Sequence, residues 1–304
     1  MSAEGVWKLV ACAPREAVEA ALLAHEDAPD WNCEIVIAGS EVAEDRPDDW
    51  RLEAWMPRPP SAADRSALAA LFAAPVEWRD EVLPDRDWVT ASQTGLKPIR
   101  AGRFYVHAPG QPPHPDTDVR SFAIPAGQAF GTGHHATTAG SLEMLSAIRA
   151  SGAVVRDCAD IGTGTGLLAF AALELWPRAR VTASDIDPVC ATVVAENAMR
   201  NGIAIGAGPG ELTMTVAEGL DHPLLIARAP YDLVTANILA RPLIELMPAL
   251  AGVTAAGGHL VLAGLLVTQQ PAVRRAATRF GFRLARSEVR GDWSILWFRR
   301  RAAR

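Results

Sequence analysis

The chain has 304 residues, of which 49% are hydrophobic and 21% charged, so it is expected to fold into about two globular domains. No apolar run reaches the roughly 18 residues of a membrane span, and the four scattered cysteines form no CxxC pair, which argues against a zinc site or a disulfide framework and fits a reducing cytoplasm. The net charge of −6 is uneven: residues 1–84 carry 17 acidic and 7 basic side chains, and residues 85–304 carry 18 and 22.

The first 84 residues alternate strands and helices in the order β-α-β-β-α-β, which predicts a ferredoxin-like α+β domain. Expected strands cover 5–13, 33–39, 50–56 and 76–82, and expected helices cover 14–26 and 61–74. Ser61 is expected to cap the second helix. This fold names no activity by itself. Its acidic surface would suit a basic partner, or it is a solvated surface that aids solubility.

Residues 85–120 are rich in proline and hold one expected strand, at 102–108. Such proline density predicts a semi-stiff spacer and not a packed domain. We therefore expect three parts, with boundaries at 1–84, 85–120 and 121–304.

From residue 121 onwards strands and helices alternate, which predicts an open, doubly wound sheet of the Rossmann-like kind. Expected strands cover 154–164, 179–187, 212–218, 231–239 and 257–266, and expected helices cover about 166–176, 193–202, 241–253 and 273–281. Residues 282–300 read as two antiparallel strands joined at Gly291 and Asp292. Trp293 and Trp297 on these strands are expected in the core.

The strongest local signal is the segment Asp160-Ile161-Gly162-Thr163-Gly164-Thr165-Gly166, which follows an apolar strand and opens a helix. Glycine in such a turn lets the backbone approach a ligand closely. A dinucleotide fingerprint would need glycine at 167, where Leu167 stands, and no Gly-Lys-Ser/Thr follows as in a phosphate-binding P-loop. The D-x-G-x-G-x-G spacing instead resembles the S-adenosylmethionine turn of class I methyltransferases, so Gly162, Gly164 and Gly166 are candidate cofactor-binding residues.

Two carboxylates follow the next expected strand. Asp185 lies 23 residues after Gly162, where a carboxylate can accept hydrogen bonds from both hydroxyls of a ribose. Asp187 precedes Pro188 and is expected to cap the following helix. Glu218, at the end of the third strand, is either a contact to the adenine edge or an exposed acidic residue.

Two further segments narrow the family. Residues 125–138 read PAGQAFGTGHHATT, and residues 236–243 read ANILARPL. Together with the glycine turn they resemble the ribosomal protein L11 methyltransferase (PrmA) family. The resemblance implies a class I methyltransferase domain over 121–304 behind a ferredoxin-like substrate-recognition domain.

The resemblance also implies that the 125–138 loop folds over the methionine end of the cofactor, with Thr138 in contact with it. Thr137 and Thr138 can instead, or additionally, cap a helix. The adjacent His134 and His135 point in different directions and have no accompanying cysteine or carboxylate cluster, so no metal is expected.

Asn237 stands where related N-methyltransferases carry an Asn-Pro-Pro-Tyr type motif, and we expect it to be the catalytic residue and to lie at the cofactor. Its amide oxygen can accept hydrogen bonds from an amine and aim the nitrogen lone pair at the methyl group. A lysine amine must lose a proton before it attacks, and no side chain is an obvious general base. Asn237 could alternatively be a strand-end turn residue.

The sequence therefore favours an S-adenosylmethionine-dependent protein N-methyltransferase. By resemblance, its substrates are lysine ε-amines and the N-terminal α-amine of ribosomal protein L11. We expect a cytoplasmic monomer with no direct nucleic-acid or membrane contact, because residues 1–84 are acidic and the tail Arg299-Arg300-Arg301 reads as a solvated end. The alternatives are a methyltransferase of another basic protein or of a small molecule, a nucleic-acid methyltransferase, and a cofactor-sensing module without turnover.

Overall fold

The computed structural model describes residues 7–26, 31–32, 35–42, 48–82, 98–125 and 136–302. The chain divides into two compact units, Met1–Trp88 and Val89–Arg304, each with its own hydrophobic core. Among the helices in these ranges, none has the length and apolar character needed to cross a membrane.

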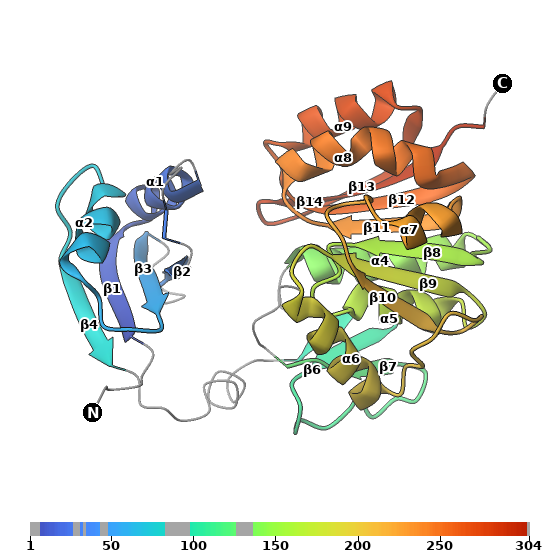
Figure 1. Cartoon of the computed structure of the whole chain (residues 1–304), viewed down its shortest axis with the longest axis horizontal. Coiled ribbons are helices and arrows are strands. Elements are labelled where there is room, and N and C mark those ends of the chain that lie inside the picture. Colours follow the sequence, from blue (N-terminus) through green and yellow to red (C-terminus); the bar gives the residue numbers. More distant parts are fainter. Residues whose placement is uncertain are drawn as a thin grey trace. The chain divides into compact units, whose positions relative to one another are not determined.

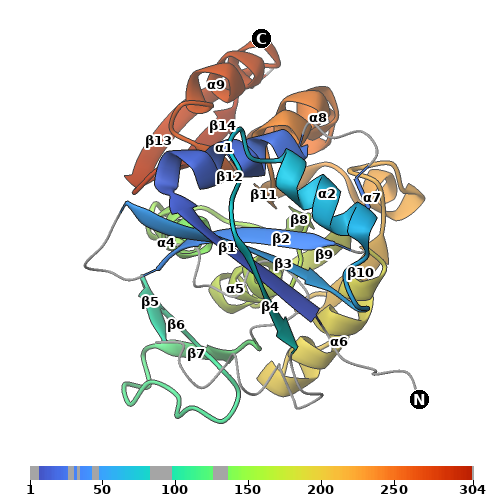
Figure 2. The same cartoon turned by 90° about the vertical axis from the view of Figure 1, so that its left-hand side faces the viewer.

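The smaller unit is a four-stranded antiparallel sheet with strand order β2-β3-β1-β4, and two helices pack on it. Its elements are β1 (Trp7–Pro14), α1 (Arg15–Glu26), β2 (Val36–Glu41), β3 (Asp49–Met56), α2 (Ala62–Ala70) and β4 (Trp78–Val82). Figure 2 shows both helices on the same side of this sheet. Ser61 caps α2 through a reciprocal box with Asp64, since each side chain accepts a hydrogen bond from the other's backbone N–H. The predicted order of elements is confirmed.

The larger unit is built on a seven-stranded sheet with strand order β10-β9-β8-β11-β12-β14-β13. Its strands are β8 (Asp157–Ile161), β9 (Arg180–Asp185), β10 (Leu212–Val216), β11 (Tyr231–Asn237), β12 (Thr254–Leu266), β13 (Phe282–Arg290) and β14 (Trp293–Arg300). Its helices are α4 (Ala136–Ala150), α5 (Leu167–Leu175), α6 (Val189–Asn201), α7 (Pro223–Arg228), α8 (Ala240–Val253) and α9 (Gln270–Arg279). Only β14 among these strands runs against its neighbours, because the predicted β13–β14 hairpin inserts it beside β12.

Helices cover both faces of this sheet, which is why its strands are nearly continuously apolar. Side chains alternate between two clusters: Cys158 and Leu233 belong to the cluster under α4 and α5, whereas Ala159 and Val234 belong to the one under α8. Figure 1 shows α8 and α9 together near β12 to β14. The doubly wound class I methyltransferase fold is confirmed. Helix α7 was not predicted, because a six-residue helix offers no periodic pattern to detect.

The expectation of an unpacked spacer is wrong for residues 98–120. Strands β5 (Ile99–Ala101), β6 (Phe104–His107) and β7 (Arg120–Ala123) form a small sheet, and Phe104 and Phe122 are fully buried in the core of the larger unit. The prolines stand in the connection between β6 and β7, so they leave these strands intact. Residues 83–97, which include the expected boundary at 84, lie outside the described residues.

Candidate active site

A cavity of about 840 Å³ opens at the carboxyl ends of β8, β9, β10 and β11. This is the edge at which open α/β sheets bind ligands, and the volume suits a cofactor-sized molecule. All of the predicted site residues except Gly166 line it: Thr138, Gly162, Gly164, Asp185 and Asn237. The fold therefore brings together residues that are up to 99 positions apart in the sequence.

The glycine turn connects β8 to α5 in a backbone conformation that other residues rarely adopt. Gly162, Gly164 and Gly166 have φ angles of +68°, +55° and +86°. A Cβ on Gly162 would lie 2.3 Å from Cγ2 of Ile238, and one on Gly166 would lie 2.7 Å from the ring of Phe170. Gly166 thus shapes the turn and begins α5 without lining the cavity.

Asp185 ends β9 and supports the glycine turn directly. Its Oδ2 accepts a hydrogen bond from the backbone N–H of Gly164 at 2.8 Å, and its Oδ1 accepts one from Asp187 at 3.1 Å. Asp187 makes the predicted capping contact, since its Oδ1 accepts from the N–H of Val189 at 2.9 Å in the first turn of α6. Glu218 also lines the cavity, at the end of β10, and Cys190 lies beside Asp185.

Asp160, the first residue of the turn motif, is buried and held by two threonines. Thr163 donates to its Oδ2 and Thr235 donates to its Oδ1, each at 2.6 Å. Burial raises the pKa of this carboxyl to about 6, although both hydroxyl hydrogen bonds act in the opposite direction. Asp160 therefore fixes the turn to β11 from below, and the sequence gave no sign of this pairing between strands.

Asn237 ends β11 and meets Thr138 from the first turn of α4. The side-chain amide of Asn237 donates to Oγ1 of Thr138 at 3.3 Å, and both residues line the cavity. Thr138 is almost fully buried, so its hydroxyl is fixed in place. This contact leaves the amide oxygen of Asn237 available as an acceptor.

Two expectations need comment. Trp293 lines the cavity, so its assignment to the core alone is wrong, whereas Trp297 packs against the core as predicted and donates to Nδ1 of His259. The segment 126–135, with His134 and His135, lies outside the described residues. In the ranges that are described, no group of three or more His, Cys, Asp or Glu side chains is arranged to hold a metal ion.

The residues present fit S-adenosylmethionine. The carboxylate of Asp185 stands at a strand end where it can accept from ribose hydroxyls, and the glycine turn brings backbone N–H groups to the same edge. Four carboxylates line the cavity (Asp185, Asp187, Glu218 and Glu245), and no arginine or lysine does so among the described residues. Such a lining favours a ligand that carries a positive sulfonium.

Comparisons with known proteins agree with this site. The family profile described as "Ribosomal protein L11 methyltransferase (PrmA)" matches residues 56–301. The ribosomal protein L11 methyltransferase of Rhizobium meliloti (strain 1021) is 40% identical over 265 residues, which cover 86% of this chain and 88% of the relative. That of Rhizobium etli (strain ATCC 51251) is 42% identical over 275 residues, covering 88% and 90%.

A solved structure shares the fold. The ribosomal protein L11 methylase from Lactobacillus delbrueckii subsp. bulgaricus has a TM-score of 0.55 and 28% identity, and the match covers 68% of this chain and all of that one. The profile match spans most of the chain, and the site residues lie within it. The chain belongs to the ribosomal protein L11 methyltransferase (PrmA) family of S-adenosylmethionine-dependent class I methyltransferases.

Proposed function

We propose that this protein transfers methyl groups from S-adenosylmethionine to lysine ε-amines and the N-terminal α-amine of ribosomal protein L11. The observation that carries the chemistry is the contact between Asn237 and Thr138 on the wall of the cavity. The cofactor supplies an electrophilic methyl group on a sulfonium, and the remaining tasks are binding and orientation. The proposal assigns those tasks to the chain's own residues.

Asn237 orients the attacking amine. Its Nδ2 is engaged by Thr138, so its Oδ1 accepts an N–H of the incoming neutral amine and directs the nitrogen lone pair along the line of displacement. Thr138 is therefore the residue that sets which way the amide faces. The amine loses its proton before attack, because an ammonium has no lone pair.

Asp185 and the glycine turn hold the donor. The Asp185 carboxylate binds the ribose hydroxyls, while its hydrogen bonds to Gly164 and Asp187 keep it fixed. Leu239 and Pro242 form the lip through which the substrate side chain enters. Leu239 is 61% exposed, which supports its contact with an incoming protein.

Residues 1–84 are proposed as the substrate-recognition domain. Their excess of acidic side chains attracts a basic ribosomal protein, and exposed carboxylates such as Glu16 and Glu77 have no ion-pair partner in the described residues. The protein is proposed to act as a cytoplasmic monomer.

The test is methyl transfer from isotope-labelled S-adenosylmethionine, followed by mass spectrometry of the products. Purified L11 should gain methyl groups on lysines and on its N-terminus, while free lysine and an unrelated basic protein should not. Reversing charge with Glu16→Lys and Glu77→Lys should raise KM for L11 several-fold and leave kcat unchanged. The matched reversal Asp118→Lys with Glu196→Lys, at exposed carboxylates of the larger unit, should have little effect. Equal methylation of the unrelated basic protein would instead identify a broad protein methyltransferase.

A further inference from the structure

The last helix and the last two strands are unusually rich in arginine. Residues 270–302 contain nine arginines, no lysine and two acidic residues, Glu288 and Asp292, although the whole chain has a net charge of −6. Glu288 is already bound by Arg290 at 2.7 Å and by Arg286 at 3.5 Å, close to the hairpin turn. The positive charge of the rest of this segment is therefore not compensated within it.

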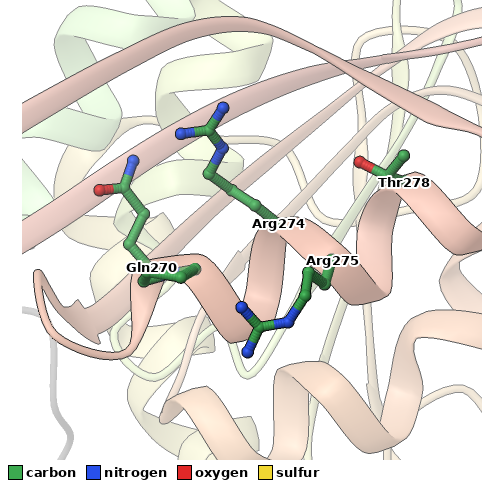
Figure 3. A pocket seen from close by; sticks show the side chains of 5 residues that line it. Gln270, Arg274, Arg275 and Thr278 are labelled. Carbon is green, nitrogen blue, oxygen red and sulfur yellow. The ribbon is translucent and has the colours of Figure 1, made fainter.

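Six exposed arginines make up what we call the arginine face: Arg274, Arg275, Arg279, Arg283, Arg299 and Arg301. Within the described part of the chain, none of them forms an ion pair with a carboxylate. Figure 3 shows Arg274 and Arg275 leaving α9 in different directions. They border an open hollow of about 440 Å³ that Gln270 and Thr278 also line.

The arginine face is continuous from the helix to the strands. Arg279 ends α9, and Arg283 follows four residues later in β13, directly opposite Arg299 of β14. The backbone N–H of Arg301 donates to the carbonyl of Gly281 at 2.9 Å, which holds the end of β14 beside the same turn. The two strand ends and the end of the helix thus meet at one place.

This arrangement opposes folding unless an anion is present. Like charges directly opposite each other on neighbouring strands are destabilising, as are like charges four residues apart on a helix. Arg283 with Arg299 is the first case, and Arg275 with Arg279 is the second. A bound polyanion would offset both.

The position of the arginine face separates it from the methyl-transfer cavity. Arg299 pairs with His259 near the start of β12, whereas the cavity is lined by Gly264 near the end of the same strand. A molecule bound at the arginine face therefore leaves the cavity accessible.

We propose that the arginine face binds the phosphate backbone of RNA. Guanidinium groups bind phosphate oxygens in pairs, and backbone recognition needs positive charge but no apolar contact. The core of a protein interface, by contrast, needs apolar and aromatic anchors. Between residues 268 and 302 the only large apolar side chain that is strongly exposed is Val289, on the half of β13 that lies away from the face. The choice of RNA rests on the proposed function, because a ribosomal protein occurs together with RNA.

The proposal departs from the expectation of no nucleic-acid contact. That expectation treated Arg299, Arg300 and Arg301 as an isolated tail. The fold instead fixes two of them: Arg299 donates to the carbonyl of Gly257, and Arg300 lies over the ring of Phe282. An ordered array of arginines replaces the solvated end.

The experiment measures RNA binding by fluorescence anisotropy, with the full chain and a labelled single-stranded RNA of about 20 nucleotides. The wild type should bind at about 50 mM salt and weaken steeply towards about 200 mM, with a slope near −0.7 for each phosphate contacted. The double variant Arg275→Glu with Arg283→Glu should weaken binding at least about tenfold and reduce the slope by about two.

The matched control reverses two exposed arginines beside β8 and β9, at the other side of the sheet, with Arg149→Glu and Arg178→Glu. The control should bind RNA as the wild type does, and both double variants should keep their melting temperature and methylate free L11 normally. If the glutamate variants do not fold, Arg275→Gln with Arg283→Gln tests the same face. No binding by the wild type, equal loss in both double variants, or displacement of the RNA by polyglutamate at equal charge would each overturn the proposal. Because no methyl donor is present, these outcomes are independent of whether L11 is the substrate.

Discussion

Gly264 supports the catalytic asparagine from the neighbouring strand, and this can be tested without touching the cavity's polar groups. It lies in β12 where the pairing with β14 shifts, and its φ is +84°. A Cβ at this position would lie 2.4 Å from the carbonyl oxygen of Ile238, 2.8 Å from its carbonyl carbon and 2.9 Å from its nitrogen. All three atoms belong to the backbone, so no change of rotamer relieves the contact. Gly264→Ala must therefore displace the residue that follows Asn237.

Gly257 provides the matched control in the same strand. Its φ is +76°, and a Cβ there would meet no atom within 4 Å. A positive φ alone costs an L-residue about 1–2 kcal/mol, and overpacking a tight site costs about 1–3 kcal/mol more. We expect Gly257→Ala to lower the free energy of unfolding by about 1–2 kcal/mol and Gly264→Ala by about 2–5 kcal/mol.

The difference should be larger in activity than in stability. Displacing a positioning group by about 1 Å can cost roughly 100-fold in rate, so Gly264→Ala should lower kcat by about that factor while Gly257→Ala leaves it near the wild-type value. Calorimetry, which resolves the two units separately, gives the stabilities, and methyl transfer to L11 gives kcat. Equal kcat values for the two variants would refute the argument that Gly264 positions Asn237.

Two further predictions concern the carboxylates of the site. The folded-state pKa of Asp160 is about 6, against an ordinary value of 3.8, so between these values only the folded state holds the proton and stability falls as pH rises, by about 3 kcal/mol in all. Asp160→Asn should therefore gain stability relative to the wild type from pH 4 to pH 7 in calorimetric scans, and a constant difference would contradict this. Asp185→Asn should weaken binding of S-adenosylmethionine about tenfold to hundredfold in isothermal titration, since hydrogen bonds to a charged carboxylate contribute about 1.5–3 kcal/mol, and an unchanged Kd would remove the ribose role.

The glycine turn was predictable because its chemistry is local. Three glycines at alternate positions after an apolar strand require backbone angles that other residues avoid, and Gly162, Gly164 and Gly166 all have positive φ. Asp185 and Asn237 were predictable for a related reason: each ends a parallel strand, and all parallel strands end at the same edge of the sheet.

What the sequence could not show was the register between strands. Thr235 reaches Asp160 because the two are paired across β11 and β8, and nothing in either strand alone indicates which residues face each other. Trp293 was misplaced for want of the sheet order. Because β13 runs parallel to β12, the hairpin turn lies at the cavity edge, and the first residue of β14 lies there too.

The packed sheet at 98–123 was missed because proline content outweighed a real alternation. Phe104 and Val106 point to the core from one strand and Phe122 from another, with the prolines confined to the connection between β6 and β7. Asn201 at the end of α6 then fixes β7, since its side chain both donates to and accepts from the backbone of Ala123. Composition averaged over the segment concealed this pattern.

The central claim is that Asn237 orients an amine of L11 for methyl transfer, and single-turnover kinetics test it most directly. With S-adenosylmethionine bound and L11 in excess, Asn237→Ala should lower the rate of transfer at least about 100-fold, while the Kd of the cofactor changes less than about tenfold. The distant amide variant Gln270→Ala on α9 should transfer at the wild-type rate. Transfer by Asn237→Ala at the wild-type rate, with the cofactor still bound, would contradict the account.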